Sequence, residues 1–312
     1  MRGLDGRRGA CSNGGMASLA PHLALALATA LTSAACATTS PSTAGRAEGL
    51  AAAPRTDGLV VTSRGLLRVD DGGPIVGASL PVIFVHGNGG DRRVWTAQLA
   101  HLRSGRRAVA FDLPGFGESP APADGDRSVK AMAGSIEALA QALGLWRFVL
   151  VCHSYGGAVA SAYAGLHPER VAGLVFVDAM GDQRTATVAE RAEEADQLSP
   201  AHYRETVEAR FAFILKGARP ATGVQVLAQL HATDPAAFRA AMLSTYEHDA
   251  AAALARYRGP RRAVAAAQFE PWGIQAQVPG IPLQVVTGVS HWVMLDAPEQ
   301  VSFLLDQFLA GI

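Results

Sequence analysis

One serine in this chain stands in a sequence context that suits a nucleophile. Ser154 lies within Cys-His-Ser-Tyr-Gly-Gly (152–157), directly after an apolar run at 146–151. This pattern predicts a sharp turn from a strand into a helix. Such a turn crowds the residues two positions before and after its serine, and the small Cys152 and Gly156 suit those positions. Ser154 is therefore the first candidate for a nucleophile.

A serine hydroxyl is a weak nucleophile at neutral pH, so it needs a base within hydrogen-bond reach. His291 is the best candidate, because it follows a strand-like run at 282–287 and precedes an expected C-terminal helix. His153, beside the serine, and His86 are expected to be structural. No motif surrounds the remaining histidines of the catalytic region.

Two glycine-rich segments stand before the serine. His-Gly-Asn-Gly-Gly (86–90) follows an apolar run at 82–85, and Asp-Leu-Pro-Gly-Phe-Gly-Glu-Ser (112–119) follows another at 108–111. Apolar runs of this length bounded by glycine and proline predict strands that end in tight loops. The order along the chain is glycine-rich loop, turn, serine and histidine.

With these four motifs in this order, the chain resembles the α/β-hydrolase superfamily over residues 57–312. The resemblance implies an α/β fold with an eight-stranded, mostly parallel sheet flanked by helices. It also implies a helical cap inserted after the sixth strand, here at about 180–258. The chain departs from the usual G-x-S-x-G motif at Cys152, which we expect to be a buried packing residue.

The resemblance assigns further roles around the serine. In this superfamily an oxyanion hole is formed by the backbone N–H of the residue after the nucleophile and by one from the loop after the third strand. These positions correspond to Tyr155 and Asn88, and His86 and Gly87 are expected to support the loop. Aromatic and apolar residues of the expected cap either line a substrate pocket or form the cap's own core: Tyr203, Phe211, Phe213, Met242 and Tyr246.

The acid that orients His291 has two candidates. Most members of the superfamily carry an aspartate after the seventh strand, but the expected strand at 263–267 is followed by Gln-Phe-Glu-Pro (268–271). We therefore predict Asp178, at the end of the sixth strand, with Glu270 as the alternative. Asp296 is expected to cap the last helix.

A serine rather than an aspartate at the elbow argues against epoxide hydrolases and haloalkane dehalogenases. The predicted reaction is hydrolysis of a small carboxylic ester through an acyl-enzyme intermediate. An acyltransferase, a C–C bond hydrolase or a cofactor-free perhydrolase would use the same residues. A non-catalytic ligand-binding member of the fold is a further alternative. The sequence leaves the natural substrate open.

The composition predicts few charged partners. The 27 basic and 27 acidic residues give a net charge of zero. A balanced chain predicts no attraction to nucleic acid or to an anionic membrane surface, and we expect a small ester-like substrate. No histidine or cysteine pair has the spacing of metal ligands, so neither a metal nor a cofactor is predicted. The oligomeric state is left open.

Residues 1–36 have the pattern of a targeting segment. A basic start and an apolar stretch at 23–31 lead to small residues before Cys36. We therefore predict a signal peptide or lipoprotein leader at 1–36 and a flexible linker at 37–56. The predicted location is the periplasm, the medium or, through a lipidated Cys36, the membrane of a bacterium.

Hydrophobic patterning predicts the elements that hold these motifs. An antiparallel pair is expected at 59–62 and 66–70. Six more strands are expected at 82–85, 108–111, 148–151, 174–177, 263–267 and 283–287, and helices at 91–102, 129–143 and 298–309.

Overall fold

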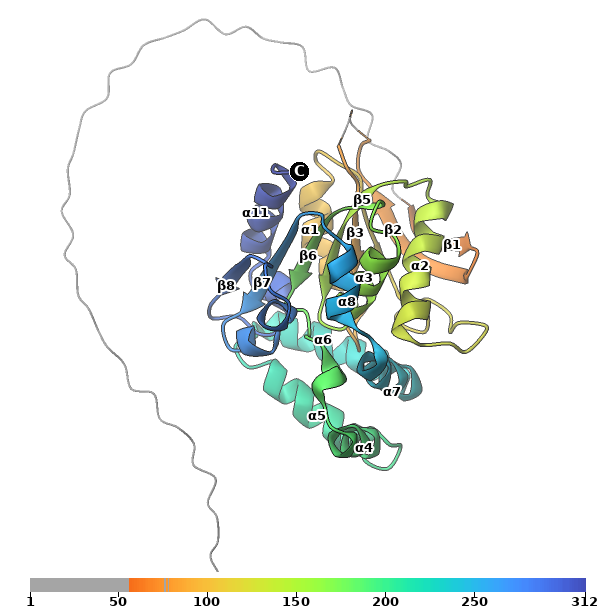
Figure 1. Ribbon diagram of the computed structural model, residues 1–312, viewed down its shortest axis with the longest axis vertical. Coiled ribbons are helices and arrows are strands. Elements are labelled where there is room, and N and C mark those ends of the chain that lie inside the picture. Colours follow the sequence, from red (N-terminus) through yellow and green to blue (C-terminus); the bar gives the residue numbers. More distant parts are fainter. Residues whose placement is uncertain (1–55, 76, 78) are drawn as a thin grey trace, which may run out of the picture. The chain divides into compact units, whose positions relative to one another are not determined.

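The computed structural model describes residues 56–312 except 76 and 78, so the predicted leader, linker and Cys36 anchor lie outside the described residues. Eight strands form one sheet in the order β1-β2-β4-β3-β5-β6-β7-β8 (Figure 1). Their bounds are β1 Thr56–Thr62, β2 Gly65–Gly72, β3 Val82–Val85, β4 Ala108–Phe111, β5 Phe148–His153, β6 Val171–Val177, β7 Arg261–Ala266 and β8 Leu283–Val286.

The sheet is mostly parallel. Strands β1 and β2 pair antiparallel, as do β2 and β4, and every other neighbouring pair is parallel. The predicted α/β architecture with an eight-stranded sheet is thus confirmed. Most strands are longer at one end than the hydrophobic runs predict, because backbone pairing continues past the apolar residues.

Helices cover both faces of the sheet. On β3, Ile83 and Val85 pack in one core, whereas Val82 and Phe84 pack in the other. This alternation follows from the two-residue period of a strand, and a parallel sheet is buried on both sides. The first core also contains residues of α2 (Val129–Ala142), α3 (Gly156–Leu166) and α8 (Ala250–Arg256). The second contains residues of α1 (Thr96–Leu102) and α11 (Pro298–Leu309).

The segment between β6 and β7 is helical. It holds α4 (Val188–Gln197), α5 (Tyr203–Ile214), α6 (Pro220–Ala232) and α7 (Pro235–Ser244), with short turns η2 (Gln183–Thr185) and η3 (Thr245–Glu247). These helices lie beyond the carboxyl ends of the parallel strands (Figure 1). Helix α8, inside the range expected for the cap, packs on α3 instead. Gly165 allows this approach, since a β-carbon there would lie 2.8 Å from the backbone of Ala253.

The expected helix at 91–102 is divided. Arg92–Trp95 forms a 3-10 turn, η1, and α1 begins at Thr96. Asp91 caps the turn by accepting a hydrogen bond from Arg93 N, as its position predicts. Three short elements complete the described chain: η4 (Glu270–Trp272), α9 (Ile274–Gln277) and α10 (Val293–Asp296). Within the described residues, no helix has the length and apolar character needed to cross a bilayer.

Candidate active site

Ser154 occupies the turn between β5 and α3 in a left-handed conformation, with φ +52°. This conformation is unfavourable for a serine and must be held by its surroundings. The turn is held in this conformation by close packing of the residues that follow it against the loop after β3. A β-carbon on Gly156 would lie 2.6 Å from the carbonyl oxygen of His86, so only glycine fits. The predicted sharp turn is therefore present, and it presents Ser154 above the carboxyl end of β5.

The glycine-rich loop after β3 lies directly against this serine. A β-carbon on Gly87 would lie 2.9 Å from Ser154 Cβ. Among the described residues, none accepts a hydrogen bond from the backbone N–H of Asn88 or of Tyr155. Two backbone donors beside a nucleophile are the arrangement that stabilises an oxyanion. The two N–H groups are thus available for the role that the sequence predicts for them.

His86 connects two loops from beneath the site. Its Nε2 accepts a hydrogen bond of 2.9 Å from the backbone N–H of Leu113, in the turn after β4. Its Nδ1 must then carry the proton, and it donates to the carbonyl oxygen of Gly87 at 2.8 Å. The side chain is buried. His86 therefore fixes the position of the loop and is not free to act as a base.

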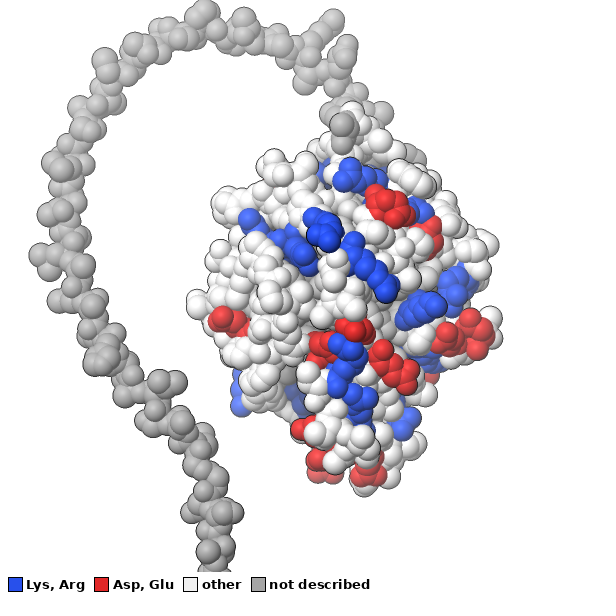
Figure 2. All heavy atoms as spheres, in the orientation of Figure 1, with Lys and Arg blue, Asp and Glu red and all other residues white. Residues whose placement is uncertain are grey.

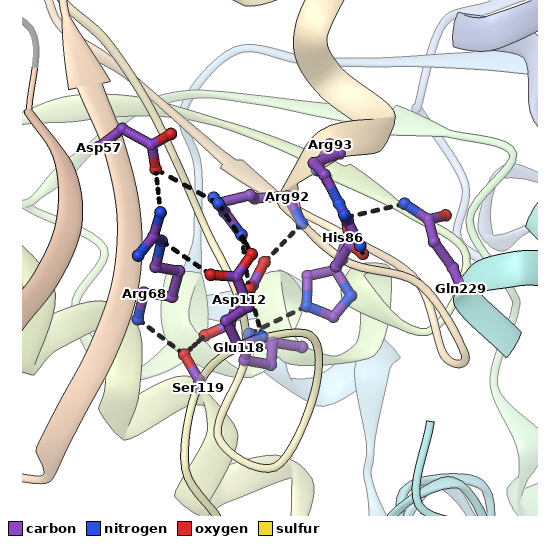
Figure 3. A network of polar contacts seen from close by, with 11 residues as sticks. Asp57, Arg68, His86, Arg92, Arg93, Asp112, Glu118, Ser119 and Gln229 are labelled. Carbon is purple, nitrogen blue, oxygen red and sulfur yellow. Dashed lines mark hydrogen bonds and ion pairs between the residues drawn. The ribbon is translucent and has the colours of Figure 1, made fainter. Parts of the chain in front are cut away.

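An ion-pair network with the buried Arg92–Asp112 pair at its centre holds the far end of the same loop (Figure 3). Arg92 donates to Asp112 from its backbone N–H at 2.7 Å and from its guanidinium at 2.9 Å. The guanidinium also reaches Glu118 and Asp57. Arg68 pairs with the same two carboxylates. The network joins the loop after β3, the turn after β4 and the β1–β2 hairpin.

His291 is held by an aspartate on the neighbouring part of the sheet. Its Nδ1 donates to Asp178 Oδ2 at 2.7 Å, and Asp178 Oδ1 accepts from the backbone N–H of Ala266 at 3.1 Å. Asp178 is buried and has φ +43°. Among the described residues, none contacts His291 Nε2 by a hydrogen bond, and no hydrogen bond joins it to Ser154 Oγ. Nε2 is therefore free to take a proton from a nucleophile.

Glu270 does not take part in this pair. It is exposed in η4, and its backbone carbonyl accepts a hydrogen bond from Gln275. The contact to His291 comes from Asp178 because Ala266, the last residue of β7, places its N–H where it binds the Asp178 carboxylate. Of the two acids predicted from the sequence, the structure brings Asp178 to the histidine and leaves Glu270 outside.

His153 supports His291 from below. Its Nε2 lies 3.0 Å from the carbonyl oxygen of His291, and the two rings are 4.6 Å apart. Burial, together with the neighbouring His291, lowers the pKa of His153 well below its usual value. A neutral His153 with its proton on Nε2 donates to that carbonyl, so this histidine acts in positioning, as its sequence context predicts.

Asp296 has a role that sequence reasoning missed. It was expected to cap α11, but the N-cap of that helix is Ala297 and has no side-chain cap. Asp296 instead accepts hydrogen bonds from Ser290 N at 2.8 Å and from Arg219 N at 2.9 Å. It therefore fixes the residue before His291 and the start of α6. One signal was present in the sequence, a carboxylate six residues after the serine that precedes the histidine.

Hydrogen bonds tie the helical segment between β6 and β7, expected to be the cap, to the loops around the site. The backbone N–H of His291 donates to the carbonyl of Ile214, Asn88 Nδ2 donates to that of Phe238, and Gln229 Nε2 donates to Asp91. These bonds tie α5, α6 and α7 to the histidine loop and to the glycine-rich loop. The helical segment and the sheet are thus both hydrogen-bonded to the loops that carry the candidate site.

Aromatic side chains enclose the glycine-rich loop and the histidine. A β-carbon on Gly89 would lie within 3.2 Å of Phe211, Leu230 and Phe238. Phe269 and Trp292 contact the ring of His291 edge-on at 5.6 and 5.2 Å between centroids. Phe211 is thus the expected cap residue that reaches the site, whereas Phe213 is about half exposed. The surroundings favour an apolar part of a ligand.

Cys152 is buried, and its thiol contacts the carbonyl oxygen of Val175. Burial raises the pKa of this thiol well above its usual value. A protonated, enclosed thiol is a packing group. Across residues 56–312 other than 76 and 78, no three His, Cys, Asp or Glu side chains gather in a group that could hold a metal ion.

Comparisons with known proteins agree with this fold. Residues 81–267 match the model of the alpha/beta hydrolase fold family. The 1-acylglycerol-3-phosphate O-acyltransferase ABHD5 of Sus scrofa is 32% identical over 151 residues, which cover 45% of this chain and 42% of that protein. The (lyso)-N-acylphosphatidylethanolamine lipase of Mus musculus is 36% identical over 104 residues, which cover 32% of this chain and 30% of that protein.

The chain thus matches less than half of the length of these curated relatives. Among solved structures, a thermophilic esterase from Thermogutta terrifontis is similar with a TM-score of 0.68 and 24% identity, covering 83% of this chain and 99% of that chain. At this level of identity the likeness shows the fold.

Proposed function

The chain belongs to the alpha/beta hydrolase fold family, and we propose that it is a serine hydrolase that cleaves a small carboxylic ester through an acyl-enzyme. One observation carries the proposal. Ser154 stands on a strained turn, the backbone N–H groups of Asn88 and Tyr155 have no acceptor among the described residues, and His291 Nδ1 is bound by the buried Asp178. The esterase-like fold of the solved neighbour supports it.

In the proposed reaction, Ser154 Oγ attacks the ester carbonyl while its proton passes to His291 Nε2. Asp178 stabilises the resulting imidazolium and keeps the ring in the tautomer that leaves Nε2 unprotonated before the attack. The N–H groups of Asn88 and Tyr155 bind the oxyanion. His291 then gives its proton to the departing alcohol, and an acyl-serine remains. Water attacks the acyl-serine with the same histidine as base, which releases the acid and restores Ser154.

The names of the relatives favour a second candidate, an acyltransferase. One of them is called a 1-acylglycerol-3-phosphate O-acyltransferase. Transfer differs from hydrolysis in one step, because an alcohol rather than water attacks the acyl-serine. The aromatic enclosure around Gly89 and His291 suits an acyl chain in either reaction.

The proposal is tested by labelling the full chain with a fluorophosphonate probe while hydrolysis of p-nitrophenyl acetate and butyrate is followed. We expect the wild-type protein to be labelled and active. Ser154→Ala should lose labelling and at least about 10³-fold in kcat. Adding 1-acylglycerol-3-phosphate to a reaction with a long-chain acyl ester separates the two candidates, since only an acyltransferase diverts the acyl group to that acceptor.

Ser161→Ala is a matched control. Ser161 lies on α3, the helix that follows Ser154, and its Oγ is 2.8 Å from His248 Nε2, but it is fully buried and donates to the carbonyl oxygen of Ala158. We expect this variant to keep labelling and activity. A folded wild-type protein that neither reacts with the probe nor hydrolyses either ester would contradict the proposal and favour a ligand-binding role.

A further inference from the structure

Arginines gather at the end of the sheet opposite the candidate site. They stand at or just before the amino ends of four strands or at the end of α8: Arg106 and Arg107 before β4, Arg147 before β5, Arg170 before β6, and Arg256, Arg258, Arg261 and Arg262 from α8 to β7. In the sheet order, β4 to β7 are separated by four strand spacings. At about 4.8 Å each, the arginines cover on the order of 19 Å.

Two of these arginines are neutralised and six are not. Arg107 pairs with Asp71, and Arg170 pairs with Glu137. The remaining six make no ion pair with any carboxylate in the part of the chain that the structure describes: Arg106, Arg147, Arg256, Arg258, Arg261 and Arg262. Glu169, next to Arg170 in the sequence, is exposed and forms no ion pair with another described residue. We call these six residues the arginine edge.

The arginine edge forms one electropositive surface. Arg147 directly precedes β5 and Arg261 begins β7, and both strands lie beside β6 in the sheet. Figure 2 shows Lys and Arg side chains in a row across the part of this face that carries the end of α8. The net charge of zero says nothing of how the charges are distributed, and the prediction of no attraction to an anionic surface rests on that total alone.

Large apolar side chains stand among these arginines. Trp146 is 71% exposed and Ile75 is 69% exposed, and both line one cavity with Leu80 and Arg147. The guanidinium of Arg170 lies over the Trp146 ring at 5.1 Å from its centroid. Exposed tryptophan beside basic side chains is the composition of protein surfaces that rest at the interface of a lipid bilayer.

The chain enters the described structure at this same edge. Thr56, the first residue of β1, is in register with Asp71, and Asp71 with Val109, the second residue of β4. The sequence upstream of Thr56 carries the predicted lipid attachment at Cys36. An anchor at Cys36 would keep the domain close to the bilayer, and the arginine edge lies at the end of the sheet where the described chain begins.

From the unpaired charge, the exposed tryptophan and the entry point of the chain, we propose that the arginine edge docks the domain on the surface of an anionic phospholipid bilayer. Phosphate groups would pair with the arginines, and the Trp146 ring would enter the headgroup region. In this orientation the cap and the candidate site at the other end of the sheet face away from the bilayer. The proposal does not depend on the reaction that the site carries out.

The first test compares the full chain with two double variants for binding to vesicles. Arg147→Gln/Arg258→Gln removes two exposed charges from the arginine edge. Lys216→Gln/Arg219→Gln removes two exposed charges from the cap, where they likewise make no ion pair with a described carboxylate. Binding of each protein is measured to vesicles of phosphatidylcholine alone and to vesicles that also contain phosphatidylglycerol, and the ratio gives the preference for anionic lipid. Every protein carries the same leader, so binding by the leader contributes equally to each.

We expect the preference of the wild-type protein for anionic vesicles to fall roughly 10- to 30-fold in the arginine-edge variant. The cap variant should keep it. Raising the salt concentration to about 1 M, where the Debye length is about 3 Å, should remove most of the difference between the wild-type protein and the arginine-edge variant. Equal loss in both variants, or a wild-type protein without any preference for anionic vesicles, would overturn the proposal.

The second test locates the contact. Trp146 and Trp272 are both exposed, at 71% and 60%, but Trp272 lies in η4 beyond the carboxyl end of β7. Vesicles with brominated acyl chains should quench the fluorescence of Trp272→Phe, which keeps Trp146, and quench Trp146→Phe much less. The reverse pattern would place the cap end on the bilayer and refute the proposed orientation.

Discussion

The two ends of the sheet differ in how their charges are used. At the carboxyl ends of the strands, three buried carboxylates each hold a defined partner: Asp178 holds His291, Asp112 holds Arg92, and Asp296 holds Ser290. At the amino ends, Arg147 and Arg258 are exposed and no carboxylate of the described chain holds them.

The contrast has a physical origin. A buried carboxylate is costly unless it is hydrogen-bonded, so it holds the groups that bind it in defined positions. An exposed arginine is solvated and fixes nothing, but it leaves its charge available to a partner. The carboxyl ends are thus built for positioned chemistry and the amino ends for an adaptable contact. Substitutions at the two ends should have effects of very different size.

The largest effect is expected at the pair that orients the histidine. Asp178→Asn should lower kcat by about 10⁴-fold, because an amide does not hold the required His291 tautomer. Asparagine tolerates the positive φ of this position, so the fold should persist. Glu270→Gln is the matched control and should change kcat less than about threefold. Ester hydrolysis with both variants measures the difference, and an equal loss in the two would reject the assignment of Asp178.

The next effect tests the close approach of the glycine-rich loop. A β-carbon on Gly87 would lie 2.8 Å from His153 Nδ1 and 2.9 Å from Ser154 Cβ. Gly87→Ala should therefore displace the loop and lower kcat/KM by about 10²-fold. Gly105→Ala, near the amino end of β4 where a β-carbon meets no atom within 4 Å, should leave kcat/KM unchanged. A fully active Gly87→Ala variant would show that this loop does not contribute to the reaction.

A smaller effect is expected on the pH dependence of stability, and it comes from the buried His153. Since the folded-state pKa of His153 lies below 6.5, the unfolded chain binds a proton that the folded protein excludes. Stability should thus fall as the pH drops below about 6.5, by up to about 1.4 kcal/mol per pH unit. His153→Gln should reduce this slope, whereas the exposed His231→Gln should not. Urea unfolding between neutral and mildly acidic pH measures both, and equal slopes in all three proteins would contradict the prediction.

The smallest effect is expected at the amino ends. Arg147→Gln/Arg258→Gln should keep kcat/KM for a soluble ester within about twofold of the wild-type value, because exposed arginines without ion pairs position no other group. Stopped assays with p-nitrophenyl butyrate measure this. A large loss of soluble-ester activity would mean that the two ends of the sheet are coupled, and the comparison drawn between them would no longer hold.

Much of the fold was predictable because it depends on local patterns. Apolar runs predicted all eight strands, and glycine and proline marked the loops between them. The division of the helix at 91–102 was missed, since both halves share one hydrophobic pattern. The packing of α8 on α3 was missed as well, because alanine-rich segments look alike whether they cap a site or flank a sheet.

The candidate site was predictable to the extent that its residues stand in motifs. Ser154 and Asn88 each lie beside glycines in a turn after a strand, and His291 follows the last expected strand. The choice between Asp178 and Glu270 was not accessible, because both follow strands that end near His291. The role of Asp296 was missed because a carboxylate just before a helix is typical of an N-cap. Only the fold shows that its side chain accepts a hydrogen bond from Ser290.

The sequence by itself determined the order of strands and helices, the nucleophile candidate and the histidine, because residue type and spacing along the chain encode them. The tertiary structure decided which acid reaches His291, how Asp112 and Arg92 hold the glycine-rich loop, and that a neutral chain has one strongly basic edge. These features depend on which strands become neighbours in the sheet. Strand neighbours are set by packing across the whole domain, and no local pattern contains that information.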